Sequence, residues 1–173
     1  MTDNSLITDL RKRYHEGKPV RILFVCLGNI CRSPAAEGIF RYITEEKGTA
    51  AHFHLDSAGL YAGHAGELPD KRMRIHAARR GYNLTHRSRP AREWDFYEFD
   101  IIIGMDDANI SGLRSLAPTE DDRKKIVRMT DFCRLHPYYD AVPDPYYEGA
   151  AGFELVLDLL EDACMALYDA ITE

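Results

Sequence analysis

The chain has 173 residues and a formal net charge of −6, and it contains no apolar run long enough to span a membrane. This length suits one domain with a sizeable core and is too short for two ordinary domains. The acidic balance argues against nucleic acid as the main partner, because surfaces that bind phosphate backbones carry an excess of Lys and Arg. Residues 1–18 are polar and lack the apolar core of a signal peptide, so we expect a cytoplasmic protein.

The cysteines suggest neither a disulfide framework nor a metal site. They are not paired in the manner of secreted domains, and no second Cys or His pair follows the first two at zinc-ligand spacing. We therefore expect no metal and no other cofactor. The four residues are Cys26, Cys31, Cys133 and Cys164.

The first twenty residues are predicted to be an N-terminal extension to a domain that spans residues 21–173. Leu6, Leu10 and Tyr14 recur at helical spacing among basic residues. This pattern fits either a short helix that docks on the domain or a frayed tail, and it suggests no function of its own.

Apolar periodicity predicts alternating strands and helices along the rest of the chain. We expect helices over residues 35–47, 70–80, 106–118 and 152–171, the last with a buried apolar stripe. We expect strands over residues 21–25, 52–57, 100–105 and 126–129. Strands that alternate with helices predict an α/β fold, a single doubly wound domain with a four-stranded parallel sheet flanked by helices and a phosphate-binding loop after the first strand.

The stretch between the first strand and the first helix of this pattern combines a thiol, a tight turn and an arginine. Cys26 stands where the strand ends, Gly28 permits the turn, and Arg32 and Ser33 open the helix. The N–H groups of such a loop, together with a helix N-terminus, attract an anion and stabilise a thiolate. The guanidinium can hold two phosphate oxygens, and the Ser33 hydroxyl can donate to the thiolate. The pattern therefore favours phosphoryl transfer through Cys26 over a buried structural cysteine beside a turn.

A second chemical segment lies near the C-terminus, where Asp144 stands between Pro143 and Pro145. Two prolines restrict the backbone and make a rigid mount for an acid. A carboxyl group is needed to protonate the leaving oxygen and later to activate water. Asp140 is the nearby competitor, but it lacks the proline frame. Without the upstream loop, Pro-Asp-Pro alone would usually indicate a turn.

The segment from Val25 to Pro34 resembles the signature loop of the low-molecular-weight protein tyrosine phosphatases. Further matches, among them Asp-Pro-Tyr-Tyr at residues 144–147, run from about residue 20 to the C-terminus. The resemblance implies an α/β fold with a four-stranded parallel sheet. It also implies a two-step hydrolysis of phosphotyrosine proteins and aryl phosphates through a phosphocysteine, without metal.

The resemblance also implies roles for individual residues. Cys26 is the nucleophile, Arg32 holds the phosphate, and Asp144 acts first as acid and then as base. Ser57 and His86 hold Asn29, and Asp106 braces the loop, although Ser57 could simply end a strand and Asp106 could simply cap a helix. The expected substrate contacts come from Leu27, Gly28, Asn29, Ile30, Cys31, Ser33, Tyr61, Tyr146 and Tyr147.

One position departs from the family pattern. Gly63 stands where the family carries an aromatic residue that forms a wall of the cleft, and Tyr61 is the candidate to serve instead. Two regulatory features are also implied by the resemblance. Cys31 can form a reversible disulfide with Cys26, and in some members the tyrosines at positions 146 and 147 are phosphorylated.

Two alternatives to a tyrosine phosphatase remain. Relatives that act on phosphoarginine typically have threonine before the second loop cysteine, and Ile30 argues against that substrate. A thiol-dependent arsenate reductase needs a downstream cysteine shuttle, which the spacing of Cys133 and Cys164 does not supply. A non-catalytic phosphotyrosine-binding module is not favoured, because such a module would be expected to have lost Cys26 or Asp144, and both are present. We expect a monomer or a weak homodimer.

Overall fold

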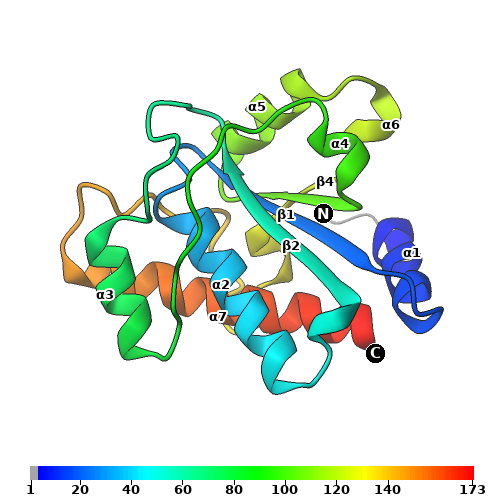
Figure 1. Cartoon of the computed structure of the whole chain (residues 1–173), viewed down its shortest axis with the longest axis horizontal. Coiled ribbons are helices and arrows are strands. Elements are labelled where there is room, and N and C mark those ends of the chain that lie inside the picture. The colour runs from blue at the N-terminus through cyan, green and yellow to red at the C-terminus, as the bar shows by residue number, and fades with distance from the viewer. Residues whose placement is uncertain (1–3) are drawn as a thin grey trace.

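Four strands lie side by side in the order β2-β1-β3-β4, and every neighbouring pair is parallel (Figure 1). In the computed structural model, which describes residues 4–173, these strands form one sheet with helices on both faces. The predicted α/β fold with a four-stranded parallel sheet is confirmed. The strands are β1 (Val20–Cys26), β2 (Phe53–Gly59), β3 (Ile101–Gly104) and β4 (Ile126–Arg128).

The central strand β1 is buried on both faces, which explains its continuous apolar sequence. Ile22 and Phe24 point into the larger core, whereas Leu23 and Val25 point into the smaller one. Side chains along a strand alternate between faces, so Cys26 belongs to the larger core. Cys26 is the last residue of β1, and its position opposite Gly59 of β2 places it at the carboxyl edge of the sheet.

The larger core lies between the sheet and the helices α2 (Arg32–Glu46) and α7 (Ala150–Thr172), with α3 (Lys71–Arg79) beside α7. The predicted stripe of α7 is buried along its whole length, because each residue in it is at most 1% exposed. The stripe consists of Phe153, Val156, Leu157, Leu160, Cys164, Leu167 and Ile171.

The opposite face of the sheet carries α4 (Asp95–Glu98), α5 (Asp107–Leu116) and α6 (Glu120–Arg123) (Figure 1). The helical turns α4 and α6 were not predicted, because four residues are too few to show helical periodicity. The 3₁₀ turns η1 (Ala50–His52) and η2 (Met129–Phe132) were missed for the same reason. Apolar periodicity placed the start of helix α2 at residue 35, but the helix begins at Arg32, so Arg32 and Ser33 open it as expected from the loop that precedes it.

The N-terminal segment forms helix α1 (Asn4–His15), which packs on α7. Leu10 is 1% exposed within the larger core. Arg11 Nε donates to the carbonyl oxygen of Ala170 over 2.9 Å, and His15 Nε2 lies 2.8 Å from the carbonyl oxygen of Glu173. The residues described from position 4 onward therefore form a docked helix rather than a tail. No helix within residues 4–173 has an apolar stretch of the length needed to cross a bilayer.

Candidate active site

The chain turns sharply between Cys26 and Arg32, and residues 26–33 are called the cysteine loop below. Asn29 adopts a left-handed conformation with φ of 55°, which asparagine tolerates better than most residues. Its side chain is 1% exposed. Its amide nitrogen donates to Ser33 Oγ over 2.7 Å and to Ser57 Oγ over 3.0 Å. Asn29 therefore ties the top of the loop to the start of α2 and to strand β2.

The amide oxygen of Asn29 accepts two further hydrogen bonds, one from His86 Nε2 at 2.9 Å and one from the backbone N–H of Arg89 at 3.0 Å. Nε2 is the donor in the first, because the oxygen of Asn29 can only accept. All four hydrogen-bonding positions of this buried amide are used. The loop conformation is therefore over-determined by contacts with distant parts of the chain.

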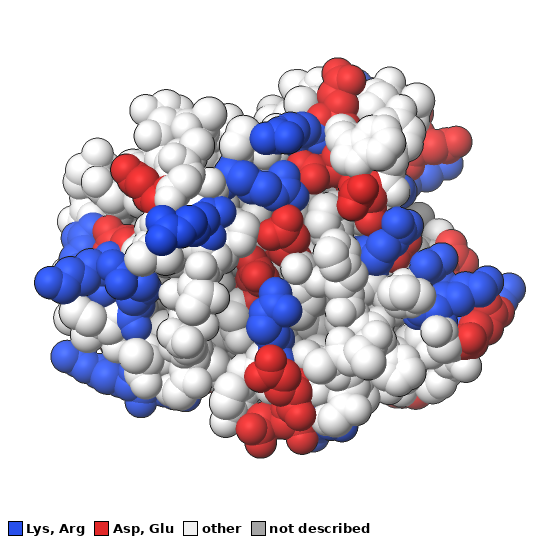
Figure 2. All heavy atoms as spheres, viewed as in Figure 1, with Lys and Arg blue, Asp and Glu red and all other residues white. Residues whose placement is uncertain are grey.

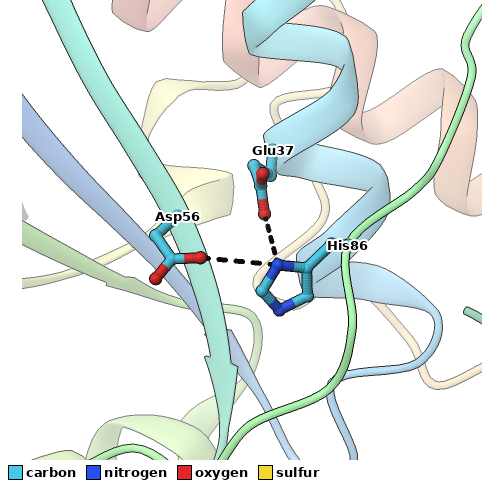
Figure 3. Close-up of side chains that lie close together, drawn as sticks. All are labelled: Glu37, Asp56 and His86. Carbon is cyan, nitrogen blue, oxygen red and sulfur yellow. Dashed lines mark ion pairs between the residues drawn. The ribbon is translucent and has the colours of Figure 1, made fainter. Parts of the chain in front are cut away.

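His86 is itself held between two carboxylates (Figure 3). Its Nδ1 lies 3.4 Å from an oxygen of Glu37 and 3.4 Å from an oxygen of Asp56. The same three side chains could offer ligand atoms to a cation, since these atoms lie within 4.8 Å of one another. Glu37 and Asp56 are, however, already ion-paired with Arg41 and Arg89 at 2.8 Å and 3.0 Å. The cluster is thus fully engaged in supporting the loop.

Cys26 has a hydroxyl group at hydrogen-bonding distance, because Ser33 Oγ lies 3.0 Å from Cys26 Sγ. Ser33 Oγ already accepts from Asn29, so its own proton is free to point at the sulfur; the alternative acceptor, the carbonyl of Ala58, is 3.4 Å away. The N–H groups of residues 27–31 donate to no acceptor among the described residues. These donors suit both a thiolate and phosphate oxygens.

Arg32 is 3% exposed and is held at both ends of its guanidinium group. Nη1 donates to Asp106 Oδ2 over 2.6 Å and to the carbonyl of Val142 over 3.1 Å. Nη2 lies 3.7 Å from Asp144 Oδ2. Asp106 also caps α5 by accepting from the N–H of Asn109 at 2.8 Å, so it contacts the loop arginine and caps a helix at the same time.

The segment with Asp144, residues 142–148, is called the acid loop below. Asp144 is about half exposed, and its Oδ1 accepts from the N–H of Tyr146 at 3.0 Å. The N–H of Val142 donates to the carbonyl of Met105 over 2.8 Å. On the far side of the acid, Arg72 Nη2 donates to the carbonyl of Tyr146 over 2.9 Å. The acid loop is therefore held on both sides of Asp144.

A pocket of about 230 Å³ opens where these parts meet. It brings together the predicted trio Cys26, Arg32 and Asp144. Other predicted residues lie in its walls, namely Leu27, Gly28, Ile30, Cys31, Tyr61, Tyr146 and Tyr147. The remaining predicted residues do not line the pocket and instead hold the loop from behind: Asn29, Ser33, Ser57, His86 and Asp106.

His64 also lines the pocket and was not predicted. Its Nδ1 lies 2.7 Å from Glu67 Oε2, and its ring meets the ring of Tyr61 edge to face at 5.8 Å. The only signal in the sequence is its place in the glycine-rich stretch, three residues from both Tyr61 and Glu67. A single histidine at such spacing is too common to indicate a site.

Tyr61 covers Gly63. A Cβ atom at position 63 would lie 2.1 Å from Cζ of the tyrosine ring, so any side chain there would displace the ring. Tyr61 is 55% exposed and lines the pocket. The absence of a side chain at position 63 therefore leaves room for the ring of Tyr61, which forms the aromatic wall of the pocket.

Burial affects the thiols of Cys31, Cys133 and Cys164. Burial raises the pKa of the Cys31 thiol well above its ordinary value, with a further contribution from the carboxylate of Asp70. Burial also raises the pKa of Cys164, and that of Cys133 to about 12. All four cysteines are free thiols, and Cys31 alone shares the pocket with Cys26.

Comparison with known sequences places this geometry in a family. Residues 21–173 match the sequence model described as low molecular weight phosphotyrosine protein phosphatase. A putative low molecular weight protein-tyrosine-phosphatase of Synechocystis is 44% identical over 145 residues, which cover 84% of this chain and 92% of the relative. The chain belongs to the low molecular weight phosphotyrosine protein phosphatases. The resemblance seen in the sequence is thereby confirmed, and the protein is a hydrolase of this kind.

Solved structures of this phosphatase family share the fold. A protein tyrosine phosphatase of Entamoeba histolytica, crystallised with Hepes in its active site, is 43% identical with a TM-score of 0.84, covering 87% of this chain and 95% of that one. A structure described as Drosophila arginine phosphatase is 29% identical with a TM-score of 0.81, covering 88% of this chain and 98% of that one.

Proposed function

We propose that this phosphatase hydrolyses phosphotyrosine in proteins, and aryl phosphates, through a phosphocysteine intermediate. Cys26 Sγ attacks phosphorus, the bond from phosphorus to the phenolic oxygen breaks, and Asp144 gives its proton to the leaving phenolate. In the second step Asp144 takes a proton from water, the water oxygen attacks phosphorus, and the S–P bond breaks. Inorganic phosphate leaves and the thiolate is restored.

The observation that carries this proposal is the convergence of Cys26, Arg32 and Asp144 on one pocket. Arg32 and the N–H groups of residues 27–31 can hold the three non-bridging oxygens, on which charge is spread in the transition state. Because Asp106 and Val142 fix Arg32 in advance, little reorganisation is needed when phosphate binds. Tyr61 and Tyr146 provide apolar surface on which a phenyl ring can stack.

An arginine phosphatase is the alternative, because the similar Drosophila protein carries that description. Ile30 favours the aryl ester here, since its side chain is an apolar part of the pocket wall. An arsenate reductase is less well supported. Its cysteine shuttle would need to reach Cys26, whereas Cys164 is buried on α7 and Cys133 does not line the pocket.

The test compares hydrolysis of an aryl phosphate and of phosphoarginine by the wild type, Cys26→Ser and Asp144→Asn. We expect the wild type to prefer the aryl ester, Cys26→Ser to be inactive, and Asp144→Asn to be slowed most with poor leaving groups. A preference for phosphoarginine would change the substrate class, and full activity of Cys26→Ser would overturn the mechanism.

We further propose that the protein works in the cytoplasm, as a monomer or a weak homodimer, with residues 1–20 as an extension to a catalytic domain over residues 21–173. Four free thiols, one of them a nucleophile, suit a reducing compartment. When a peroxide oxidises Cys26 to a sulfenic acid, the thiol of Cys31, which shares the pocket, would displace water from it and form a reversible disulfide that protects the nucleophile. Sedimentation velocity checks the oligomeric state.

A further inference from the structure

Charge is distributed unevenly around the pocket. Residues 57–92 contain eight Lys and Arg but only Glu67 and Asp70 as acids, in a chain whose net charge is −6. Residues 135–173 contain nine Asp and Glu and neither Lys nor Arg. The first segment supplies Tyr61 and His64 to the pocket, and the second supplies the residues of the acid loop. The pocket therefore lies between a basic segment, which forms the lip that carries Tyr61 and His64, and an acidic segment, which forms the lip that carries the acid loop.

Several cations of residues 57–92 are ion-paired with carboxylates, either on α7 or within the same segment. Arg80 is ion-paired with Glu154, Asp158 and Glu161 of α7. Arg72 is paired with Asp70. These pairs join α3 to α7 or involve the residue that caps α3. The charges of Arg80 and Arg72 are therefore balanced within the fold.

The cations of this segment without an ion pair among the described residues include Lys71, Arg74 and Arg87. These three follow or contact residues 66–70, which are hydrogen-bonded to the cysteine loop. We call them the basic rim. Lys71 and Arg87 are exposed, and Arg74 is partly exposed. Most of the other basic side chains described in the fold do have a carboxylate partner, such as Arg21 with Asp100 and Arg128 with Asp107. Of the eight Lys and Arg that have no ion pair among residues 4–173, five lie in residues 57–92, and three of those five form the basic rim.

The basic rim is linked to the cysteine loop through residues 66–70. Arg74 Nε donates to the carbonyl of Pro69, and Arg87 Nη1 donates to the carbonyl of Gly66, each over 2.9 Å. The N–H of Asp70, which ends this short segment, donates to the carbonyl of Ile30 over 2.7 Å. Figure 2 shows basic side chains gathered at the end of the molecule where Figure 1 places α3.

We propose that the basic rim binds acidic residues next to the phosphotyrosine, so that the preferred substrates carry phosphotyrosine in an acidic sequence. This inference rests on the proposed function. At physiological salt, the interaction between exposed charges is largely screened beyond about 8 Å. The charges beside the pocket therefore affect a bound peptide more than the net charge of the chain does. The acid loop repels acidic residues from the other lip, and the preference is therefore directional: acids on one side of the phosphotyrosine are favoured over acids on the other.

The test measures kcat/KM for three phosphotyrosine peptides of equal length, at low and at physiological salt. One has glutamates before the phosphotyrosine, one has glutamates after it, and one has glutamine at all of these positions. Exposed ion pairs are individually weak, so we expect about a three- to tenfold preference for one of the two acidic peptides, and a smaller one at the higher salt.

The variant that tests the surface is Lys71→Glu/Arg87→Glu, with Lys71→Gln/Arg87→Gln as a milder version. The matched control is Lys47→Glu/Arg114→Glu, since both control residues are exposed and have no ion pair among residues 4–173. Lys47 caps the end of α2 farthest from the cysteine loop. We expect both rim variants to lose the acidic preference and the control to keep it.

Equal rates with all three peptides, or a preference that survives in both rim variants, would overturn this proposal. The proposed function is judged separately by hydrolysis of p-nitrophenyl phosphate, which has no flanking residues. If the wild type hydrolyses this ester but has the same kcat/KM for all three peptides, only the proposal for the basic rim is refuted. A wild type that hydrolyses neither the ester nor the peptides refutes the proposed function.

Discussion

His86 donates a hydrogen bond from Nε2 to the amide oxygen of Asn29 over 2.9 Å, across 57 positions of sequence. It thereby helps to fix the left-handed residue of the cysteine loop. We expect His86→Ala to leave a buried acceptor with a partner missing, at a cost of about 1–3 kcal/mol in stability, and to lower kcat by about ten- to a hundredfold. Kinetics with an aryl phosphate and denaturant unfolding measure the two effects. His54→Ala, at an exposed histidine on β2, is the control and should retain its kcat.

Arg72 holds the acid loop through the carbonyl of Tyr146, and its guanidinium lies 4.9 Å from the ring centre of Phe153. Without this contact the acid loop should be more mobile, and Asp144 should protonate the leaving group less efficiently. We expect Arg72→Ala to lower kcat about tenfold for phenyl phosphate but much less for p-nitrophenyl phosphate, whose leaving group needs little protonation. Arg72→Lys should recover part of the loss. An equal loss with both esters would show that Arg72 does not act through the acid.

Tyr61 and a side chain at position 63 compete for the same space. Loss of the ring in Tyr61→Ala should raise KM for an aryl phosphate about two- to tenfold, which corresponds to the 0.5–1.5 kcal/mol of one aromatic contact. Tyr61→Ser/Gly63→Tyr should restore most of this loss by placing a ring at the later position. Unchanged KM in Tyr61→Ala would contradict the assignment of Tyr61 as the wall.

Asp162 anchors the segment before the acid loop and is 5% exposed. Burial opposes its ionisation, but the N–H groups of Arg134, Leu135 and His136 outweigh burial and hold the pKa of the Asp162 carboxyl below its usual value. A lowered pKa stabilises the fold fully above the ordinary carboxyl pKa of about 4, and this stabilisation is lost as pH falls through the folded-state value.

Asp162→Asn should accordingly be less stable than the wild type by about 2 kcal/mol or more at pH 7, and the difference should shrink towards pH 3. Urea unfolding at a series of pH values gives this difference. Asp169→Asn, which removes a surface ion pair with Arg134, should change stability little. A difference for Asp162→Asn that does not depend on pH would contradict the role given to the carboxylate.

Helix α1 should contribute stability without taking part in the chemistry. Leu10→Ala removes a fully buried side chain and should cost about 2–5 kcal/mol. Because α1 contacts β1 and α7 and supplies no residue to the pocket, kcat below the melting transition should stay close to that of the wild type. Thermal unfolding and aryl phosphate kinetics check both statements. Ile75→Ala on α3, where the side chain is 43% exposed, should cost far less.

The sequence predicted the fold because its strongest signals are local. The apolar runs around Phe24 and Ile102 mark strands that are buried on both faces, and the stripe of α7 has an unbroken helical period. Parallel strands end at the same edge of a sheet, so the sequence alone predicts that residues that follow β1 and β3 lie near one another. The short helices α4 and α6 were not predicted, because a single turn is too short to show helical periodicity.

The site was only partly predictable. Cys26 and Arg32 lie in one short segment whose residue types together indicate phosphate chemistry. The prolines around Asp144 indicate an acid on a rigid backbone. Contacts between distant segments left no comparable signal. The carboxylates of Glu37 and Asp56 beside His86, and the bond from Arg72 to the acid loop, depend on side-chain directions that periodicity does not encode.

The most direct test of the mechanism is a rapid-quench experiment with Asp144→Asn and p-nitrophenyl phosphate, followed by mass spectrometry. This ester forms the intermediate with little help from an acid, whereas its hydrolysis still needs a base to activate water. We predict a burst of p-nitrophenolate and a phosphoryl group on the peptide that contains Cys26. A burst without phosphocysteine, or a phosphoryl group on another residue, would contradict the account.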